Sequence, residues 1–253
     1  MINEAMDLIE SNQFRALVIG NEGPNFSAGA NLNLLLELSQ HEEWDALEYA
    51  VKKFQDLSQR IRFCSGPVIA APFQLTLGGG VEIVQPAAHR VAAAETYMGL
   101  VEVGVGLIPG GGGNLRMILN ALDSNTGRMG AFQKIKSTFE IIGFAKIAKS
   151  AEEAIKLGYL NSNDTIVLNR SHLLKVAKDK ALAKERVQHA ASQAQRDTLR
   201  LNVCKTQSQY CKKQDFVDHQ IIEIDKWNII INKIEKDLLQ LKGLYVKAAV
   251  SRN

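Results

Sequence analysis

The sequence predicts an α/β fold followed by a long helical tail. Short apolar runs of strand character alternate with segments whose apolar residues recur every three or four positions, which is typical of α/β architectures. The 253 residues, 46% hydrophobic and 23% charged, suffice for one large domain or two small ones with a sizeable core. From about Lys184 glycine and proline almost vanish, and Lys, Gln and Arg become frequent. We expect a globular region over residues 1–183 and a helical tail over 184–253.

The N-terminal third predicts a helix, a strand and two further helices. EAMDLIE reads as the end of a helix, and FRALVIGN is a short strand closed by Asn21 and Gly23. GPNFSAGANLNLLLELSQ begins as a loop of small residues and takes on helical spacing from Leu32. WDALEYAVKKFQDLSQRIRFC keeps that spacing throughout, so we expect an amphipathic helix there.

The middle of the chain predicts two more strands around a glycine-rich turn. PVIAAPF is a candidate buried strand, and the glycines of TLGGGVE follow it, with a short helical piece up to about Pro86. HRVAAAETYMGL is then a single extended piece. The segment 114–160 reads as helices broken by LDSNTG.

The tail carries apolar residues at steps of three and four, as one long amphipathic helix or a coiled-coil strand would. These residues are Val217, Ile221, Ile224, Trp227, Ile231, Ile234, Leu238, Leu241 and Tyr245. We expect this helix to pack on its own domain or on a neighbouring subunit. The tail is basic, but it lacks aromatic residues interleaved with the basic ones and any recognisable nucleic-acid-binding module, so a solvated helical surface explains its charge better.

Several classes of protein are disfavoured. No apolar run reaches the ~18 residues that span a membrane, and MINEAMDLIESNQF lacks the order of a signal peptide. Cys64, Cys204 and Cys211 are too few and too scattered for a disulfide framework, so we expect a reduced, cytoplasmic protein. No dinucleotide fingerprint, P-loop, HExxH motif, Cys/His cluster or Ser-His-Asp arrangement is visible, so neither a metal nor a redox cofactor is predicted.

The glycine-rich stretch TLGGGVEIVQPAAHRVAAAETYMGLVEVGVGLIPGGGGN contains the strongest chemical signal. Glycines between a strand and a helix let backbone N–H groups approach an oxyanion, and NFSAGANL has the same character. Glu82 and Glu102 each stand among apolar residues, where a carboxyl group acquires a raised pKa and serves as an acid or a base. Spacing alone leaves two interpretations open, because a lone glutamate after three glycines is more often an acid at a helix N-terminus.

Three motifs, in order and at characteristic spacing, resemble the enoyl-CoA hydratase/isomerase (crotonase) family. They are NFSAGANL, PVIAAPFQLTLGGGVE and YMGLVEVGVGLIPGGGGN, and the likeness covers about residues 1–183. It is strongest to the hydratase part of bacterial fused 3-hydroxyacyl-CoA dehydrogenase/enoyl-CoA hydratase proteins. The resemblance implies a spiral core of ββα repeats, here without the first strands of that core.

The resemblance also implies a reaction and its residues. The backbone N–H groups of Ala30 and Gly79 would form an oxyanion hole for a thioester carbonyl. Glu82 would activate a water molecule, and Glu102 would hold that water and protonate Cα. Ala28, Gly78 and Gly110 would line the substrate and the water. The substrate class would be acyl-CoA thioesters, with coenzyme A as part of the substrate and no separate cofactor.

Enoyl-CoA hydratase activity in fatty-acid β-oxidation is therefore the leading expectation, in a homo-oligomer that is a trimer or a hexamer by family resemblance. The chain departs from the family in three places: Asn31 replaces a common aspartate, the chain begins inside the first helix, and the tail from about Lys184 is unmatched. Two alternatives stay open. One is an enoyl-CoA isomerase, and the other is a truncated, inactive module that self-associates through its tail.

Overall fold

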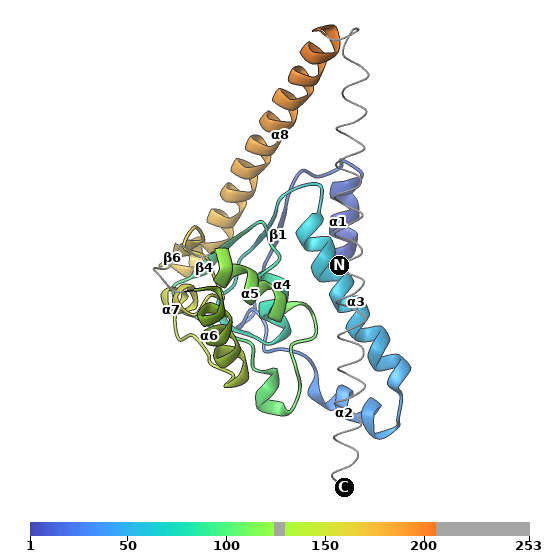
Figure 1. The fold of residues 1–253 in the computed structure, drawn as a ribbon, viewed down its shortest axis with the longest axis vertical. Helices are drawn as coiled ribbons and strands as arrows, with labels where there is room; N and C mark the ends of the chain where they lie inside the picture. Colours follow the sequence, from blue (N-terminus) through green and yellow to red (C-terminus); the bar gives the residue numbers. More distant parts are fainter. Residues whose placement is uncertain (124–129, 206–253) are drawn as a thin grey trace. The chain divides into compact units, whose positions relative to one another are not determined.

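The structure, a computed structural model, describes residues 1–123 and 130–205. Residues 1–189 form one compact unit, and α8 continues from it through residues 190–205 (Figure 1). The helices are α1 (Ile2–Glu10), α2 (Leu32–Gln40), α3 (Trp44–Phe63), α4 (Gly79–Val84), α5 (Gly113–Asp123), α6 (Ala131–Gly143), α7 (Ala151–Lys156) and α8 (Leu173–Lys205), with short 3-10 turns η1 (Glu102–Val105) and η2 (Arg170–His172). The strands are β1 (Leu17–Ile19), β2 (Val68–Ala70), β3 (Gln74–Leu77), β4 (His89–Ala93), β5 (Thr96–Gly99) and β6 (Thr165–Val167).

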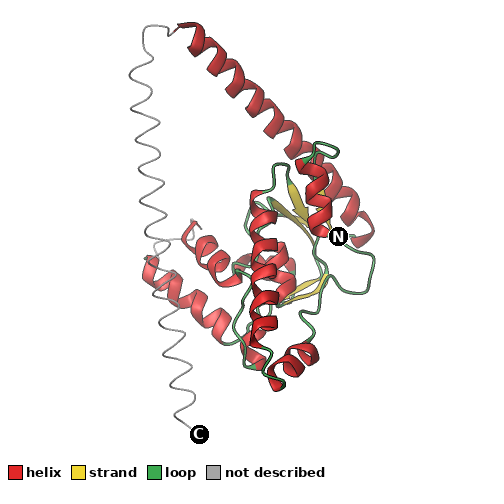
Figure 2. Cartoon of the chain, turned by 90° about the vertical axis from the view of Figure 1, so that its right-hand side faces the viewer, coloured by secondary structure: helices red, strands yellow, loops and turns green. Residues whose placement is uncertain are grey.

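The strands form two parallel sheets. The larger sheet has the order β1-β2-β4-β6, and the smaller one pairs β3 with β5. Two successive units, β2-β3-α4 and β4-β5-α5, place their first strand in the larger sheet and their second in the smaller. Figure 2 shows these strands at the centre of the unit with helices around them. The predicted core of ββα repeats is therefore confirmed.

One predicted strand is wrong in detail. The segment HRVAAAETYMGL is not a single extended piece but two strands, β4 and β5, that belong to different sheets. The chain turns between them because Thr96 Oγ1 donates a hydrogen bond to the Ala93 carbonyl at 2.6 Å, which closes a tight corner. Strands β3 and β6 were not predicted. The three-residue strands β1 and β2 lie within longer apolar runs, whereas β3 and β6 alternate with or adjoin polar residues and carry too short an apolar pattern to identify.

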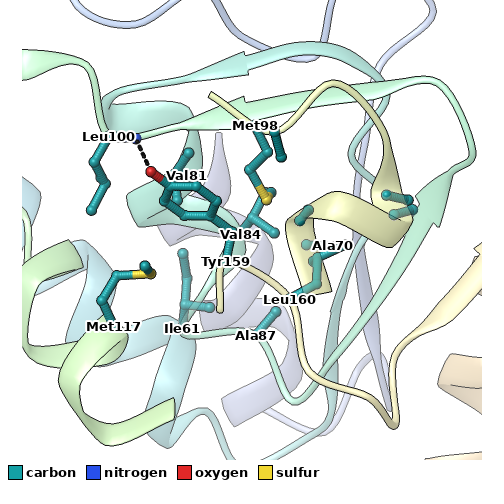
Figure 3. Close-up of a cluster of buried hydrophobic side chains, with 14 of the residues drawn as sticks. Ile61, Ala70, Val81, Val84, Ala87, Met98, Leu100, Met117, Tyr159 and Leu160 are labelled. Atoms are coloured by element: carbon teal, nitrogen blue, oxygen red, sulfur yellow. Dashed lines mark hydrogen bonds between the residues drawn. The ribbon is translucent and has the colours of Figure 1, made fainter. Parts of the chain in front are cut away.

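Both faces of the larger sheet are buried, as in other parallel sheets. Alternate residues of β2 point to opposite sides, so Val68 and Ala70 join one apolar cluster while Ile69 joins another. The first cluster also receives side chains from α1, α3, α4, α5 and α7, and Tyr159 lies in it beside Val81 and Leu160 (Figure 3). The second is covered by the start of α8. The site described below stands on the side of the first cluster.

The predicted helices before residue 87 are confirmed as α1, α2, α3 and α4. Asn31 caps α2, because its side-chain oxygen accepts hydrogen bonds from the N–H groups of Asn33 and Leu34. Helix α1 lies alongside α3 (Figure 1). In the segment 114–160, α5, α6 and α7 account for the predicted helices, while part of LDSNTG lies outside the described residues.

Helix α8 begins at Leu173 and passes the predicted division between residues 183 and 184 without interruption. That division therefore stays a prediction. The apolar repeat from Val217 to Tyr245 lies outside the described residues. Among the helices of residues 1–123 and 130–205, none combines the length and the apolar character that a membrane crossing requires.

Candidate active site

The loop before α2 and the turn before α4 are packed directly against each other. The backbone N–H of Ser27 donates to the Leu75 carbonyl, and the N–H of Leu77 donates to the Ser27 carbonyl, both at 2.9 Å. Ser27 and Thr76 are thus paired as in a parallel sheet. A Cβ at Gly80 would lie 2.6 Å from Ser27 Cβ, so only glycine permits this approach. Ser27 is the small loop residue that its sequence context indicates.

This pairing sets the places of the two predicted backbone donors. Ala30 and Gly79 each follow the paired residues Ser27 and Thr76 by three positions, and the residues before them are close, because a Cβ at Gly78 would lie 3.8 Å from Gly29 Cα. Gly79 is the first residue of α4, where a backbone N–H has no partner inside the helix. Within the described part of the chain, neither the Ala30 N–H nor the Gly79 N–H donates a hydrogen bond. Both remain available to an oxygen atom of a ligand.

Glu82 is buried in the first turn of α4 and is oriented by a distant glycine run. Its Oε1 atom accepts hydrogen bonds from the backbone N–H groups of Gly111 and Gly113, each at 2.8 Å. The second oxygen, Oε2, accepts none from the described residues and lies 2.9 Å from where a Cβ at Gly111 would stand. Burial raises the pKa of Glu82, and the backbone hydrogen bonds, that of Gly113 first, partly oppose this rise.

Glu102 opens the η1 turn after β5 and approaches the same glycine turn. A Cβ at Gly78 would lie 3.3 Å from Glu102 Oε1, and Gly78 has a φ of +54°, so a side chain is disfavoured there for two reasons. Glu102 Oε2 is buried and has no hydrogen-bond partner among the described residues. Burial is the main cause that raises the pKa of Glu102 to about 7, and the charge of Glu82 adds to it.

Tyr159 supports the strand that leads to Glu102. Its hydroxyl donates to the Lys146 carbonyl at 2.6 Å and accepts the N–H of Leu100 at 3.4 Å (Figure 3). Burial, opposed by the Leu100 hydrogen bond and aided by the Glu102 charge, raises the pKa of Tyr159 to about 12. The hydroxyl is therefore protonated at neutral pH, and its two hydrogen bonds hold the backbone at the end of β5 in place.

The structure brings most of the predicted site residues to one place. Glu82, Glu102 and Gly78 lie together, Gly79 begins the adjoining helix, and Ala30 follows the loop that is bridged to it. Ala28 is exposed in that loop next to the bridge. Gly110 stands beside Gly111 in the glycine run, with its carbonyl turned toward α3. The roles of these residues stay predictions.

Sequence reasoning missed four contributors to the site. Gly111 and Gly113 belong to the run PGGGGN, but the spacing of its glycines does not indicate that their N–H groups donate to Glu82. Phe54 and Gln55 lie on α3, and their contacts with glycines 79, 110 and 111 appear only in the folded chain. The available signal was indirect: a run of four glycines indicates close packing against something.

Repeated ββα units that bring two carboxyl groups and two unpartnered backbone N–H groups together define a protein of the crotonase fold class. Comparison with known proteins agrees. The model of the family described as "Enoyl-CoA hydratase/isomerase" matches residues 1–237, and the chain belongs to this family. The match extends beyond residue 183, into the segment that resembled no family by its motifs.

Relatives with curated names are longer proteins. A "Probable 3-hydroxyacyl-CoA dehydrogenase" of Bacillus subtilis is 45% identical over 181 residues, which cover 72% of this chain and 22% of that protein. A "Putative fatty acid oxidation complex trifunctional enzyme" of Rickettsia prowazekii is 31% identical over 174 residues, covering 69% and 23%. The chain thus spans less than a quarter of the length of either relative. A "Probable enoyl-CoA hydratase" of Bacillus subtilis is 33% identical over 117 residues, 46% of this chain and 44% of that protein.

Solved structures confirm the fold. An enoyl-CoA hydratase from Polaromonas sp. JS666 superposes with a TM-score of 0.59 at 23% identity, covering 86% of this chain and 79% of that one. An enoyl-CoA hydratase from Bacillus anthracis gives a TM-score of 0.58 at 24% identity, covering 86% and 84%. At such identities the likeness establishes the crotonase fold alone.

Proposed function

We propose that this chain is an enoyl-CoA hydratase that adds water to a trans-2-enoyl-CoA and yields a 3-hydroxyacyl-CoA, as a step of fatty-acid β-oxidation. The observation that carries this proposal is the meeting of two carboxyl groups with raised pKa values beside two backbone N–H groups that have no partner among the described residues. Family membership and the hydratase names of relatives support the same reaction. Coenzyme A enters as part of the substrate, and water addition needs no other group.

The proposed chemistry assigns each group one task. The N–H groups of Ala30 and Gly79 hold the thioester oxygen and stabilise its charge as the enolate forms. Glu82, fixed through Oε1, directs Oε2 at a water molecule and accepts its proton while the water oxygen bonds to C3 of the substrate. Glu102, with a pKa of about 7, holds a proton for part of the time at neutral pH and delivers it to C2. The oxygen and one proton of the water become the hydroxyl group at C3. Its other proton, taken up by Glu82, replaces the proton that Glu102 gave to C2, so both carboxyl groups return to their starting states.

The first prediction tests these two roles. We expect purified chain to hydrate crotonyl-CoA, and we expect Glu82→Gln and Glu102→Gln each to lower kcat by roughly 10²–10⁴-fold, because each removes an acid/base group. The loss of the conjugated thioester absorbance measures the rate. Glu152→Gln, on the exposed side of α7, is the matched control and should leave the rate unchanged.

Two outcomes would count against the proposal. Hydration that survives both glutamate substitutions would show that the site assignment is wrong. A folded protein that neither hydrates crotonyl-CoA nor binds an acyl-CoA would favour the alternative of an inactive module. If the chain instead moves the double bond of a 3-enoyl-CoA, product analysis will reveal an isomerase in which one glutamate shuttles the proton.

The oligomeric state and the cellular location of the proposed enzyme are proposals as well. We expect a homo-oligomer, because the family resemblance implies a trimer or a hexamer. We place it in the cytoplasm on the basis of its three scattered cysteines, of which Cys64 is a free thiol in the described structure.

A further inference from the structure

Helix α3 contacts the glycine run at residues 110–113 through two consecutive side chains. Gln55 Nε2 donates a hydrogen bond of 2.7 Å to the Gly110 carbonyl, across 55 positions of sequence. The ring of Phe54 fills the neighbouring space, because a Cβ at Gly111 would lie 2.3 Å from Phe54 Cε1 and one at Gly79 would lie 3.2 Å from Cζ. Helix α3 therefore contacts the glycine run at two places: Gln55 binds the carbonyl oxygen of Gly110, and Phe54 packs against the Cα atom of Gly111.

The same run is what orients Glu82. Immediately after the carbonyl held by Gln55 come the N–H groups of Gly111 and Gly113, which donate to Glu82 Oε1. Glycine residues restrict the backbone less than any others, and Gly112 adopts a φ of +109°. The shape of such a run therefore depends on the hydrogen bonds that hold its backbone groups. One of these hydrogen bonds is local to the run, from Asn114 Nδ2 to the Pro109 carbonyl at 3.1 Å. The hydrogen bond from Gln55 comes from another element, α3.

We infer that Gln55 is a positioning residue for Glu82. By fixing the Gly110 carbonyl it keeps the N–H groups of Gly111 and Gly113 aimed at Oε1, so that Oε2 stays turned toward the reacting water. This inference rests on the proposed function, and nothing in the motifs or in the names of relatives assigns a role to Gln55. The residue is exposed, so its hydrogen bond contributes little to the core and its identity is explained by the carbonyl that it reaches.

If Gln55 positions Glu82, its loss should change the pKa of Glu82, which a contact that only stabilises the fold would not do. The N–H groups of Gly113 and Gly111 oppose the effect of burial on the pKa of Glu82, so loosening the run raises that pKa further. Among the described residues, the titratable groups near Glu82 are Glu102, from η1, and Tyr159, which lies near Glu102. Helix α3 contributes the uncharged Phe54 and Gln55, and α5 begins with the backbone of Gly113. A change at position 55 adds or removes no charge at the site if the new side chain is neutral.

The second prediction uses three variants. Gln55→Met keeps the length of the side chain but cannot donate, and we expect it to lower kcat by roughly ten- to a hundredfold with a small change in KM, as misplacement of a reacting group does. The limb of the pH–rate profile that belongs to Glu82 should move to higher pH. Gln55→Lys restores a donor and should recover part of the rate, but its positive charge lowers the pKa of Glu82, so the pH–rate limb is compared between Gln55→Met and wild type only. Gln59→Ala, one turn further along α3 at an exposed position, is the matched control and should behave as wild type.

A second readout does not depend on catalysis. In protein labelled with 13C at the glutamate carboxyl carbon, NMR titration should give a higher pKa for Glu82 in Gln55→Met than in wild type. An unchanged kcat, or an unchanged Glu82 pKa, in Gln55→Met overturns the inference. So does an equal loss in Gln59→Ala, which would indicate general damage to α3. If wild type lacks hydratase activity while the Glu82 pKa rises in Gln55→Met, the proposed function fails and the positioning role stands.

Discussion

At the scale of single residues, Glu102 shows how a reactive site opposes stability. Its pKa is 4.5 in an unfolded chain and about 7 in the folded one, so the folded state binds the proton more tightly. The contribution of this group to the free energy of unfolding is therefore complete below pH 4.5 and is lost as the pH rises to about 7. At neutral and alkaline pH the protein carries a charge that its pocket disfavours.

The third prediction follows from this loss of stability with rising pH. Glu102→Gln does not titrate, so we expect it to be more stable than wild type at pH 8 by roughly 1–2 kcal/mol, because solvent screens part of the effect at this partly exposed group, and to lose this advantage near pH 4. Urea unfolding at the two pH values measures the difference, with Glu152→Gln as the control that should show none. A gap between Glu102→Gln and wild type that is the same at both values would mean that the pKa of Glu102 is not raised.

The two catalytic candidates could be predicted from the sequence because each lies inside a local motif. Glu82 directly follows three glycines, and Glu102 lies within LVEVGVGL. What holds them could not be predicted, because Gly111 and Gly113 reach Glu82 from 29 and 31 positions away. The contact of Gln55 with Gly110 is more distant still. Such contacts depend on how α3, α4 and α5 pack, and no local pattern encodes that packing.

At the scale of elements, strand β6 illustrates why short strands escape prediction. Its three residues pair with β4, and the pairing is reinforced by Asp164, which immediately precedes β6. The Asp164 carboxylate accepts hydrogen bonds from Arg90 Nε at 2.8 Å, from the Arg90 N–H at 3.0 Å and from the Asn161 N–H at 2.7 Å. A buried ion pair between distant residues, rather than strand propensity, thus fixes this edge of the sheet.

The fourth prediction concerns this ion pair. The side chains of Arg90 and Asp164 are 7% and 3% exposed, so Asp164→Ala leaves a buried guanidinium without its counter-charge. We expect a loss of about 3–5 kcal/mol in the free energy of unfolding. Asp179→Ala removes an exposed pair with Lys175 on α8 and should cost less than about 1 kcal/mol. Similar losses in the two variants, measured by urea unfolding, would contradict a structural role for the buried pair.

At the scale of the whole molecule, the apolar side chains of α6 call for a covering partner. Phe132, Ile135 and Phe139 are 79%, 41% and 74% exposed, and their spacing of three and four places them on one face of the helix. Monomeric proteins seldom leave such a stripe in water. We expect a second copy of the chain to cover it in the proposed homo-oligomer.

The fifth prediction separates this face from the tail as the source of assembly. Phe132→Lys combined with Phe139→Lys should shift the sedimentation coefficient to that of a smaller species, because charges disfavour the contact. The control, Lys136→Ala combined with Glu140→Ala, removes an exposed ion pair of the same helix and should leave assembly unchanged. A chain ended at His189 keeps the compact unit and lacks the rest of the tail. If that chain is monomeric while the double lysine variant stays assembled, self-association belongs to the tail and α6 does not carry it.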